Sequence, residues 1–128
     1  MAKYAHADVL DGGLNAIRLV ATQMLLLDAY IIGDSYATVV GNKLAEVTMD
    51  ATDPTTDYVL SGADAAARVL TTAVKSSTAS ATGAAAAIAF TDGVSKVLWV
   101  TTETSGQTVT LGNTVNFPAL TYTSGQPT

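Results

Sequence analysis

Few side chains in this 128-residue chain could do chemistry, and the densest group is a set of three aspartates. Asp50, Asp53 and Asp57 fall within one short stretch, and three carboxylates brought together could bind Ca²⁺. Their spacing differs from that of an EF-hand loop, and no glycine or bidentate glutamate follows at the required position. Asp53-Pro54 is also a turn signal in its own right. We therefore predict a loop here and no metal site.

The rest of the chain contains few side chains that could act in catalysis or bind a cofactor. The chain has no cysteine and one histidine, His6, which excludes thiol catalysis, cysteine-based metal sites and two-histidine metal motifs. The only glutamates are Glu46 and Glu103, and nothing in the sequence brings them together as a glycosidase pair. No glycine lies in a phosphate-binding motif. The inventory predicts a protein that is not an enzyme and carries no cofactor.

Trp99 and His6 can each be interpreted as a structural or as a functional residue. Trp99 is the only tryptophan, and we interpret it as the anchor of a hairpin core. The alternative is a sugar-stacking platform or an interface hot spot. His6 precedes the first predicted helix, and we interpret it as a surface or interface residue and not as a catalyst.

Composition and charge indicate the kind of partner. Charged residues are 13% of the chain, apolar residues are 48%, and the mean hydropathy is +0.33, so little material is left for a fully solvated surface. This pattern favours a subunit that covers part of its surface with other chains; the alternative is a compact monomer with an Ala/Thr/Ser surface. The net charge of −5 argues against a nucleic-acid partner, which requires clustered Lys and Arg. Nine of the eleven acids lie in residues 1–64, which we attribute to turns and helix starts; an acidic face for a basic partner is the alternative.

Hydropathy gives no indication of a membrane or export segment. The most apolar run, Leu19–Ile32, is too short to cross a bilayer and contains Gln23 and Asp28. The first residues lack the apolar stretch and cleavage site of a secretion signal. We expect no membrane partner, and a protein made and used in a cytoplasm or in an assembly built there.

The elements that must position these residues are mostly short strands. Apolar residues at helical spacing predict a helix over 8–21 with Asp8 as N-cap, and a weaker helical turn over 35–44. The strongest hairpin signal joins 84–91 to 96–102 through Asp92-Gly93, and its second arm should alternate strictly between two faces. The other predicted strands are 23–30, 45–49, 58–60, 67–74, 109–111, 115–117 and 120–122, with a turn and an exposed strand over 76–83. Pro118 marks a bulge or an edge position.

These elements predict a mainly β (α+β) fold. The expected architecture is a β-sandwich or flattened barrel of short antiparallel strands with an N-terminal helix packed at one side. The length predicts one domain over residues 1–128, with a short N-terminal arm (1–7) and a short C-terminal arm (123–128).

An ordered set of landmarks resembles a known family along nearly the whole chain. The landmarks are YAHADVLDGGLNAIR at 4–18, DSYAT at 34–38, FTDG at 90–93, LWVTT at 98–102 and GNTVNFP at 112–118. They resemble a family of small proteins encoded among the virion genes of tailed bacteriophages. The parts at 10–18 and 112–118 are the most distinctive.

The resemblance implies a non-enzymatic virion structural protein. Within that class we expect a capsid decoration (cement) protein on the capsid surface, whose partners are the major capsid protein and copies of itself. The alternatives are a tail or head–tail junction protein and a virion-displayed carbohydrate-binding module. For the decoration role, the two arms are the expected reaching elements, and the candidate interface anchors are Tyr4, His6, Phe117 and Tyr122.

Overall fold

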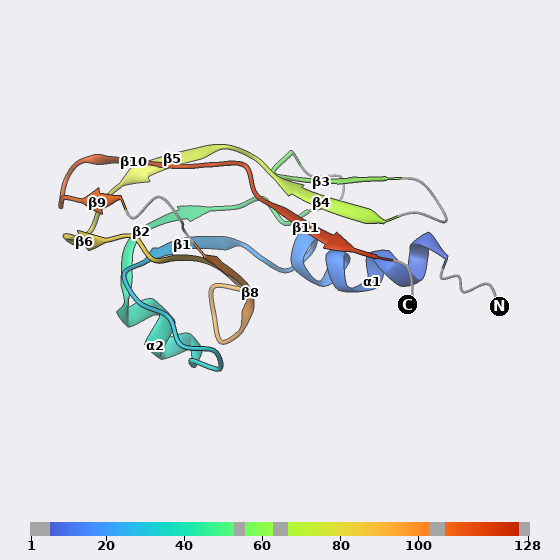
Figure 1. The fold of residues 1–128 in the computed structure, drawn as a ribbon, viewed down its shortest axis with the longest axis horizontal. Helices are drawn as coiled ribbons and strands as arrows, with labels where there is room; N and C mark the ends of the chain where they lie inside the picture. The colour runs from blue at the N-terminus through green and yellow to red at the C-terminus, as the bar shows by residue number, and fades with distance from the viewer. Residues whose placement is uncertain (1–5, 53–55, 63–66, 103–106, 126–128) are drawn as a thin grey trace.

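The computed structural model describes residues 6–52, 56–62, 67–102 and 107–125 (Figure 1). The helices are α1 (Ala7–Arg18) and α2 (Tyr36–Gly41). The strands are β1 (Gln23–Leu27), β2 (Lys43–Thr48), β3 (Tyr58–Ser61), β4 (Arg68–Thr72), β5 (Lys75–Thr78), β6 (Gly83–Ala84), β7 (Ala87–Thr91), β8 (Val97–Thr102), β9 (Thr108–Val109), β10 (Thr114–Phe117) and β11 (Thr121–Ser124). Every strand pair is antiparallel, so the predicted mainly β fold with an N-terminal helix is confirmed. Neither helix is long and apolar enough to cross a membrane in the part of the chain that is described.

The largest sheet, which we call sheet A, has the strand order β2-β1-β7-β8. Its two central strands are apolar on both faces: Met24 and Leu26 of β1 point to one side, and Leu25 and Leu27 point to the other. A strand covered on both sides reads as a continuous apolar run, which is the pattern of Met24–Leu27. The predicted central strand over 23–30 is therefore confirmed, although it ends at Leu27.

The second β layer is built on a bent two-stranded ribbon, which we call the long ribbon (residues 68–78 and 114–124), and β3 pairs with the other edge of β4. Strands β4 and β5 pair with β11 and β10, and the same register holds on both sides of a short break. The break contains Pro118, which has no N–H to donate and so cannot continue the ladder. Within the break, the Thr72 N–H donates to the Leu120 carbonyl at 2.8 Å and keeps the two halves in step. Figure 1 shows the ribbon extending along the long axis of the molecule.

The main core lies between sheet A, the long ribbon and α1. Its largest buried side chains come from these three parts and from β3, which supplies Tyr58; they are Leu14, Met24, Tyr58, Leu70, Phe90 and Phe117. A smaller core fills the opposite face of sheet A, where Val39 of α2 packs on Leu25 and Ala89. The chain is thus layered, with α1 and the ribbon on one side of sheet A and α2 on the other.

Helix α1 differs from its predicted boundaries at both ends. The His6 imidazole accepts the Asp8 N–H at 3.1 Å, so His6 is the N-cap and Asp8 lies in the first turn. The helix ends at Arg18, after which Ala21 turns into the main core. Gly12 and Gly13 lie within it, and each costs about 1 kcal/mol relative to Ala in a helix interior.

The C-terminal arm is also shorter than predicted. Residues 123 and 124 pair with β4, so they belong to the sheet. Residues 1–5 and 126–128 lie outside the described part of the chain.

The β7–β8 hairpin is confirmed, but its first arm begins at Ala87, because Ala84 pairs with β9, and its second arm does not alternate strictly. The register shifts between Phe90 and Thr91, where the partner of Phe90 is Trp99 and that of Thr91 is Val97. This bulge places the two neighbours Leu98 and Trp99 against the main core, while Val97 and Val100 pack on the smaller one. The prediction that Trp99 and Val97 share a face was therefore wrong, because a bulge adds a residue to one strand and resets its alternation.

Candidate functional site

A hollow opens on the α2 side of sheet A, between the segment after β1 and the ends of β7 and β8. Its volume is about 370 Å³. The lining residues are Tyr30, Ile32, Ala86, Ala87, Val100, Thr101 and Thr102. Two features of the sequence leave this space open. Alanines occupy positions 86 and 87, where larger side chains would fill it, and α2 is a helix of only six residues.

Ile31 and Ile32 project beside this hollow from a tight turn. The Asp34 carboxylate accepts the Ile31 N–H, and the Asp34 N–H donates back to the Ile31 carbonyl, both at 2.9 Å. Gly33 closes the turn with a φ of 95°, a backbone conformation that favours glycine. Ile31 is 74% exposed and Ile32 is 94% exposed. The turn thus holds two large apolar side chains in water in a fixed position.

The segment that carries the turn is anchored to the residue that ends α2. The Asp28 N–H donates to the Asn42 carbonyl at 3.0 Å, and the Asn42 side-chain amide donates to the Ala29 carbonyl at 3.2 Å. Both bonds are made by residues just after β1, so they fix the segment that leads to Ile31 and Ile32.

The chemistry of the hollow is that of a binding site for a neutral, mainly apolar group. The polar groups of its lining side chains are the hydroxyls of Tyr30, Thr101 and Thr102, and none of the described residues that line it is charged. A volume of this size accommodates one or two apolar side chains of a partner, and pockets for small ligands begin at about 300 Å³. Ile32 lines the hollow and is also exposed to solvent, so a partner that binds in the hollow would cover the Ile31–Ile32 turn as well.

Trp99 lies on the other side of sheet A. Its ring stacks on the buried Phe90 ring, with centroids 4.7 Å apart and planes at 10°, and it meets Tyr122 edge-on at 5.4 Å. The side chain is partly buried against the main core. One face of the indole is therefore occupied by Phe90, as expected for a hairpin anchor.

The four predicted interface anchors do not form one surface. Phe117 is buried in the main core, so its ring is filled by contacts within the chain. His6 is exposed and caps α1, and Tyr122 is exposed on β11, where its ring contacts Trp99. Tyr4 lies outside the described residues. Of the three described anchors, His6, Phe117 and Tyr122, none lines the hollow.

The aspartate loop is occupied by protein contacts. The Asp57 carboxylate is buried, lies 2.9 Å from the Lys75 ammonium and accepts the Asp50 N–H. The hydroxyl and the backbone N–H of Thr52 bind the Asp50 carboxylate and hold its pKa below the usual value. Asp53 is not described, and the described acids and His6 form no group of three that could hold a metal.

Of the two glutamates, the structure describes Glu46 alone. Glu46 accepts a hydrogen bond from the Gln23 amide at 2.6 Å and pairs with Lys43 at 3.2 Å. Glu103 lies outside the part of the chain that is described.

Sequence reasoning missed the hollow and its turn. A signal was present: two adjacent β-branched apolar residues, Ile31 and Ile32, stand directly before the turn residues Gly33-Asp34. That position is at the end of the buried strand β1, where apolar residues are expected to point into the core. The pattern alone therefore did not distinguish the exposed Ile31 and Ile32 from the buried residues of β1.

Comparisons with known proteins found no relative: no family model, no curated protein and no solved structure matches the chain.

Proposed function

We propose that this protein is a non-enzymatic structural component of a tailed-bacteriophage virion, a decoration (cement) protein that binds the major-capsid lattice. The proposal rests on the landmarks at 4–18 and 112–118 and on the low charge of the chain. In this role the hollow and the Ile31–Ile32 turn contact the lattice.

The observation that carries the proposal is the pair of isoleucines held in water by the Asp34 turn. Burying one large aliphatic side chain contributes about 1.5–3 kcal/mol. Because a shell presents many equivalent sites, a modest contribution at each occupied site sums over the assembled lattice through linkage. The neutral lining of the hollow fits an apolar side chain of the lattice subunit.

Binding to shells assembled from the major capsid protein of the same genome tests the proposal. We expect saturable binding in hundreds of copies per particle, and Ile32→Asp should weaken it by about 10-fold or more, because a carboxylate would have to be desolvated in the apolar contact. Val94→Asp is the matched control: Val94 is also a β-branched residue, 76% exposed, but lies in the turn at the opposite end of the β7–β8 hairpin from the hollow.

Three results would contradict the proposal. The first is the absence of binding to shells. The second is equal loss of binding in the two variants, which would remove the hollow from the contact. The third is a particle count of six or twelve, which would indicate a connector or tail position.

A further inference from the structure

The end strand of sheet A lacks the features that protect an exposed strand edge. Strand β8 is the last strand in the order β2-β1-β7-β8, so β7 is its only partner within the sheet. None of its six residues is charged, and none is proline. Among the described residues, none outside β7 makes a backbone hydrogen bond with Val97–Thr102. Alternate N–H and C=O groups of an edge strand point away from its neighbour, so β8 presents a row of backbone groups that the described chain does not pair.

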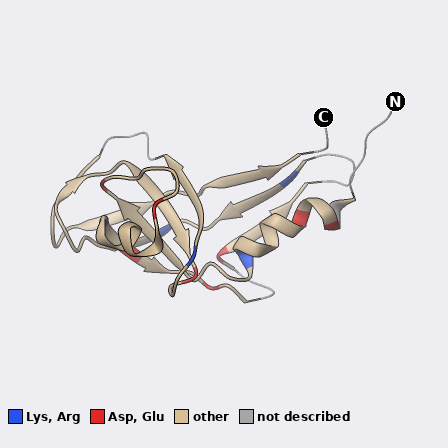
Figure 2. Ribbon diagram, turned by 90° about the horizontal axis from the view of Figure 1, so that it is seen from below, with Lys and Arg blue, Asp and Glu red and all other residues tan. Residues whose placement is uncertain are grey.

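The other strand edges in the described part of the chain are short, charged or already occupied. Strand β2, at the opposite edge of sheet A, carries Lys43 and Glu46, and its Leu44 carbonyl accepts the Ser80 N–H at 2.8 Å. The strands outside sheet A have four residues or fewer. Charged residues are sparse along the whole described chain (Figure 2), so the length of β8 matters as much as its lack of charge. Because proteins keep free edges short or charged, a long uncharged edge indicates a strand that another chain covers.

The hollow borders the main chain of this edge strand. Val100 pairs with Ala89, whose side chain lies in the smaller core. Thr101 pairs with Ile88, whose side chain lies in the main core. Directly paired residues share a face of the sheet, so Val100 and Thr101 point to opposite faces. Both residues line the hollow, as does Thr102. The hollow therefore touches the backbone of β8 as well as its side chains, and it adjoins the unpaired edge.

We propose that an extended segment of the lattice subunit pairs with β8 as a fifth strand of sheet A and places an apolar side chain in the hollow. The inference rests on the proposed function, and it specifies which part of the partner binds. Because the hollow is the proposed lattice contact and adjoins β8, a strand that pairs there belongs to the lattice subunit.

The chemistry of the edge and of the hollow defines this segment. A strand is the backbone conformation whose N–H and C=O groups match those of an open edge, so the segment must be extended. Its side chains then alternate between the two faces of sheet A, and those on the α2 side reach the hollow. The hollow has no charged residue in its described lining, so it selects an uncharged apolar side chain at that position. Main-chain hydrogen bonds supply affinity, and the hollow supplies specificity.

Amide hydrogen exchange of the protein, free and bound to shells of the major capsid protein, tests the pairing. On shells, the outward N–H groups within residues 97–102 should exchange at least about tenfold more slowly, because each gains a partner. Strand β3 is the matched control, since it is the edge strand of the other sheet and should exchange equally in both states. Shell binding with unchanged exchange in β8 would overturn the pairing and leave the proposed function intact. Absence of shell binding would contradict the proposed function itself.

Peptides distinguish strand pairing from a contact that only covers β8. Overlapping short peptides that span the major capsid protein are the probes, and fluorescence anisotropy of labelled peptides measures binding. N-methylation of the binding peptide should weaken binding by at least about tenfold at every second residue and have little effect at the residues between, because only alternate N–H groups of an added strand face β8. An effect without this alternation, or no binding peptide although shells bind, would overturn the proposal. So would a dimer that protects β8 from exchange without shells, which would assign the edge to a second copy.

Discussion

Removing the Trp99 ring should destabilise the protein by about 3 kcal/mol. A fully buried tryptophan costs about 3–5 kcal/mol when it is replaced by alanine. Trp99 keeps part of its surface in water, so we expect the lower end of that range. Part of the loss comes from the stacked contact with Phe90 at 4.7 Å, because the deletion exposes one face of a ring that is otherwise fully buried. The rest comes from transfer of the indole to water and from the edge contact with Tyr122.

Urea unfolding followed by far-ultraviolet circular dichroism measures this loss. Trp99 is the only tryptophan, so its fluorescence cannot report on the variant that lacks it. Tyr122→Ala should cost about 1 kcal/mol, because one edge-to-face aromatic pair contributes about 0.5–1.5 kcal/mol. In the double variant the two losses should fall short of additivity by a similar amount, since both variants remove the same contact. A loss below 1 kcal/mol for Trp99→Ala, or full additivity with Tyr122→Ala, would refute the assigned packing.

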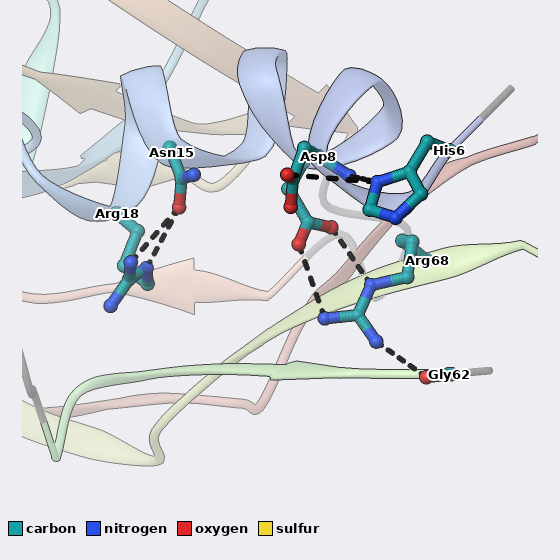
Figure 3. A network of polar contacts seen from close by, with 7 residues as sticks. His6, Asp8, Asn15, Arg18, Gly62 and Arg68 are labelled. Atoms are coloured by element: carbon teal, nitrogen blue, oxygen red, sulfur yellow. Dashed lines mark hydrogen bonds and ion pairs between the residues drawn. The ribbon is translucent and has the colours of Figure 1, made fainter. Parts of the chain in front are cut away.

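Three other perturbations have defined outcomes. Arg68→Ala removes the guanidinium that donates two hydrogen bonds to the Asp11 carboxylate of α1 (Figure 3), and it should lower the free energy of unfolding by about 1.5–3 kcal/mol, the range for hydrogen bonds to charged groups. A loss under about 0.5 kcal/mol in urea unfolding would show that this contact is dispensable. Backbone N–H groups of Lys96, Ser95 and Val94 hold the pKa of Asp92 below its usual 3.8, so the stability it provides is present above pH 4 and is lost as the pH falls through the lowered pKa. Unfolding at a series of acid pH values should show a smaller acid loss in Asp92→Asn than in the wild type. Burial, with a smaller effect of Asp57, raises the pKa of Tyr58 well above 10, so stability should fall as the pH rises above about 10; alkaline unfolding of Tyr58→Phe should lack this fall, and an identical slope would contradict the assignment.

The features that the sequence predicted well are those encoded by local chemistry. The β7–β8 hairpin was visible because Asp92-Gly93 supplies the whole turn. The Asp92 carboxylate accepts three backbone N–H groups between 2.8 and 2.9 Å, and Gly93 adopts a φ of 76°. The helical turn predicted over 35–44 has a similarly local cause, since the Ser35 hydroxyl accepts the Thr38 N–H at the start of α2. Such signals lie within four residues of the position they determine.

The features that the sequence did not predict depend on residues far apart in the chain. Phe117 has the exposed neighbours Asn116 and Pro118, and only the pairing of β10 with β5 turns its ring inward. The hollow lies where the loop after β1 meets the ends of β7 and β8, so its lining residues come from three segments that are far apart in the chain. The bulge in β8 is fixed by packing on both cores, so the alternating pattern of the sequence was misleading there.

The long ribbon has a consequence for the order in which the chain can fold as it is synthesised. One strand of the ribbon is formed by β4 and β5, and the other by β10 and β11. Because β6, β7, β8 and β9 lie between them in the chain, β4 and β5 are synthesised long before their partners. The β1–β2 and β7–β8 hairpins join neighbouring or nearby segments and can form first, whereas pairing between distant segments is slow. Until β10 and β11 arrive, β5 and one side of β4 present open strand edges, which readily pair with other chains. The C-terminal segment therefore acts as a closing strand, and a chain that stops before Thr114 would retain sheet A yet be prone to aggregate.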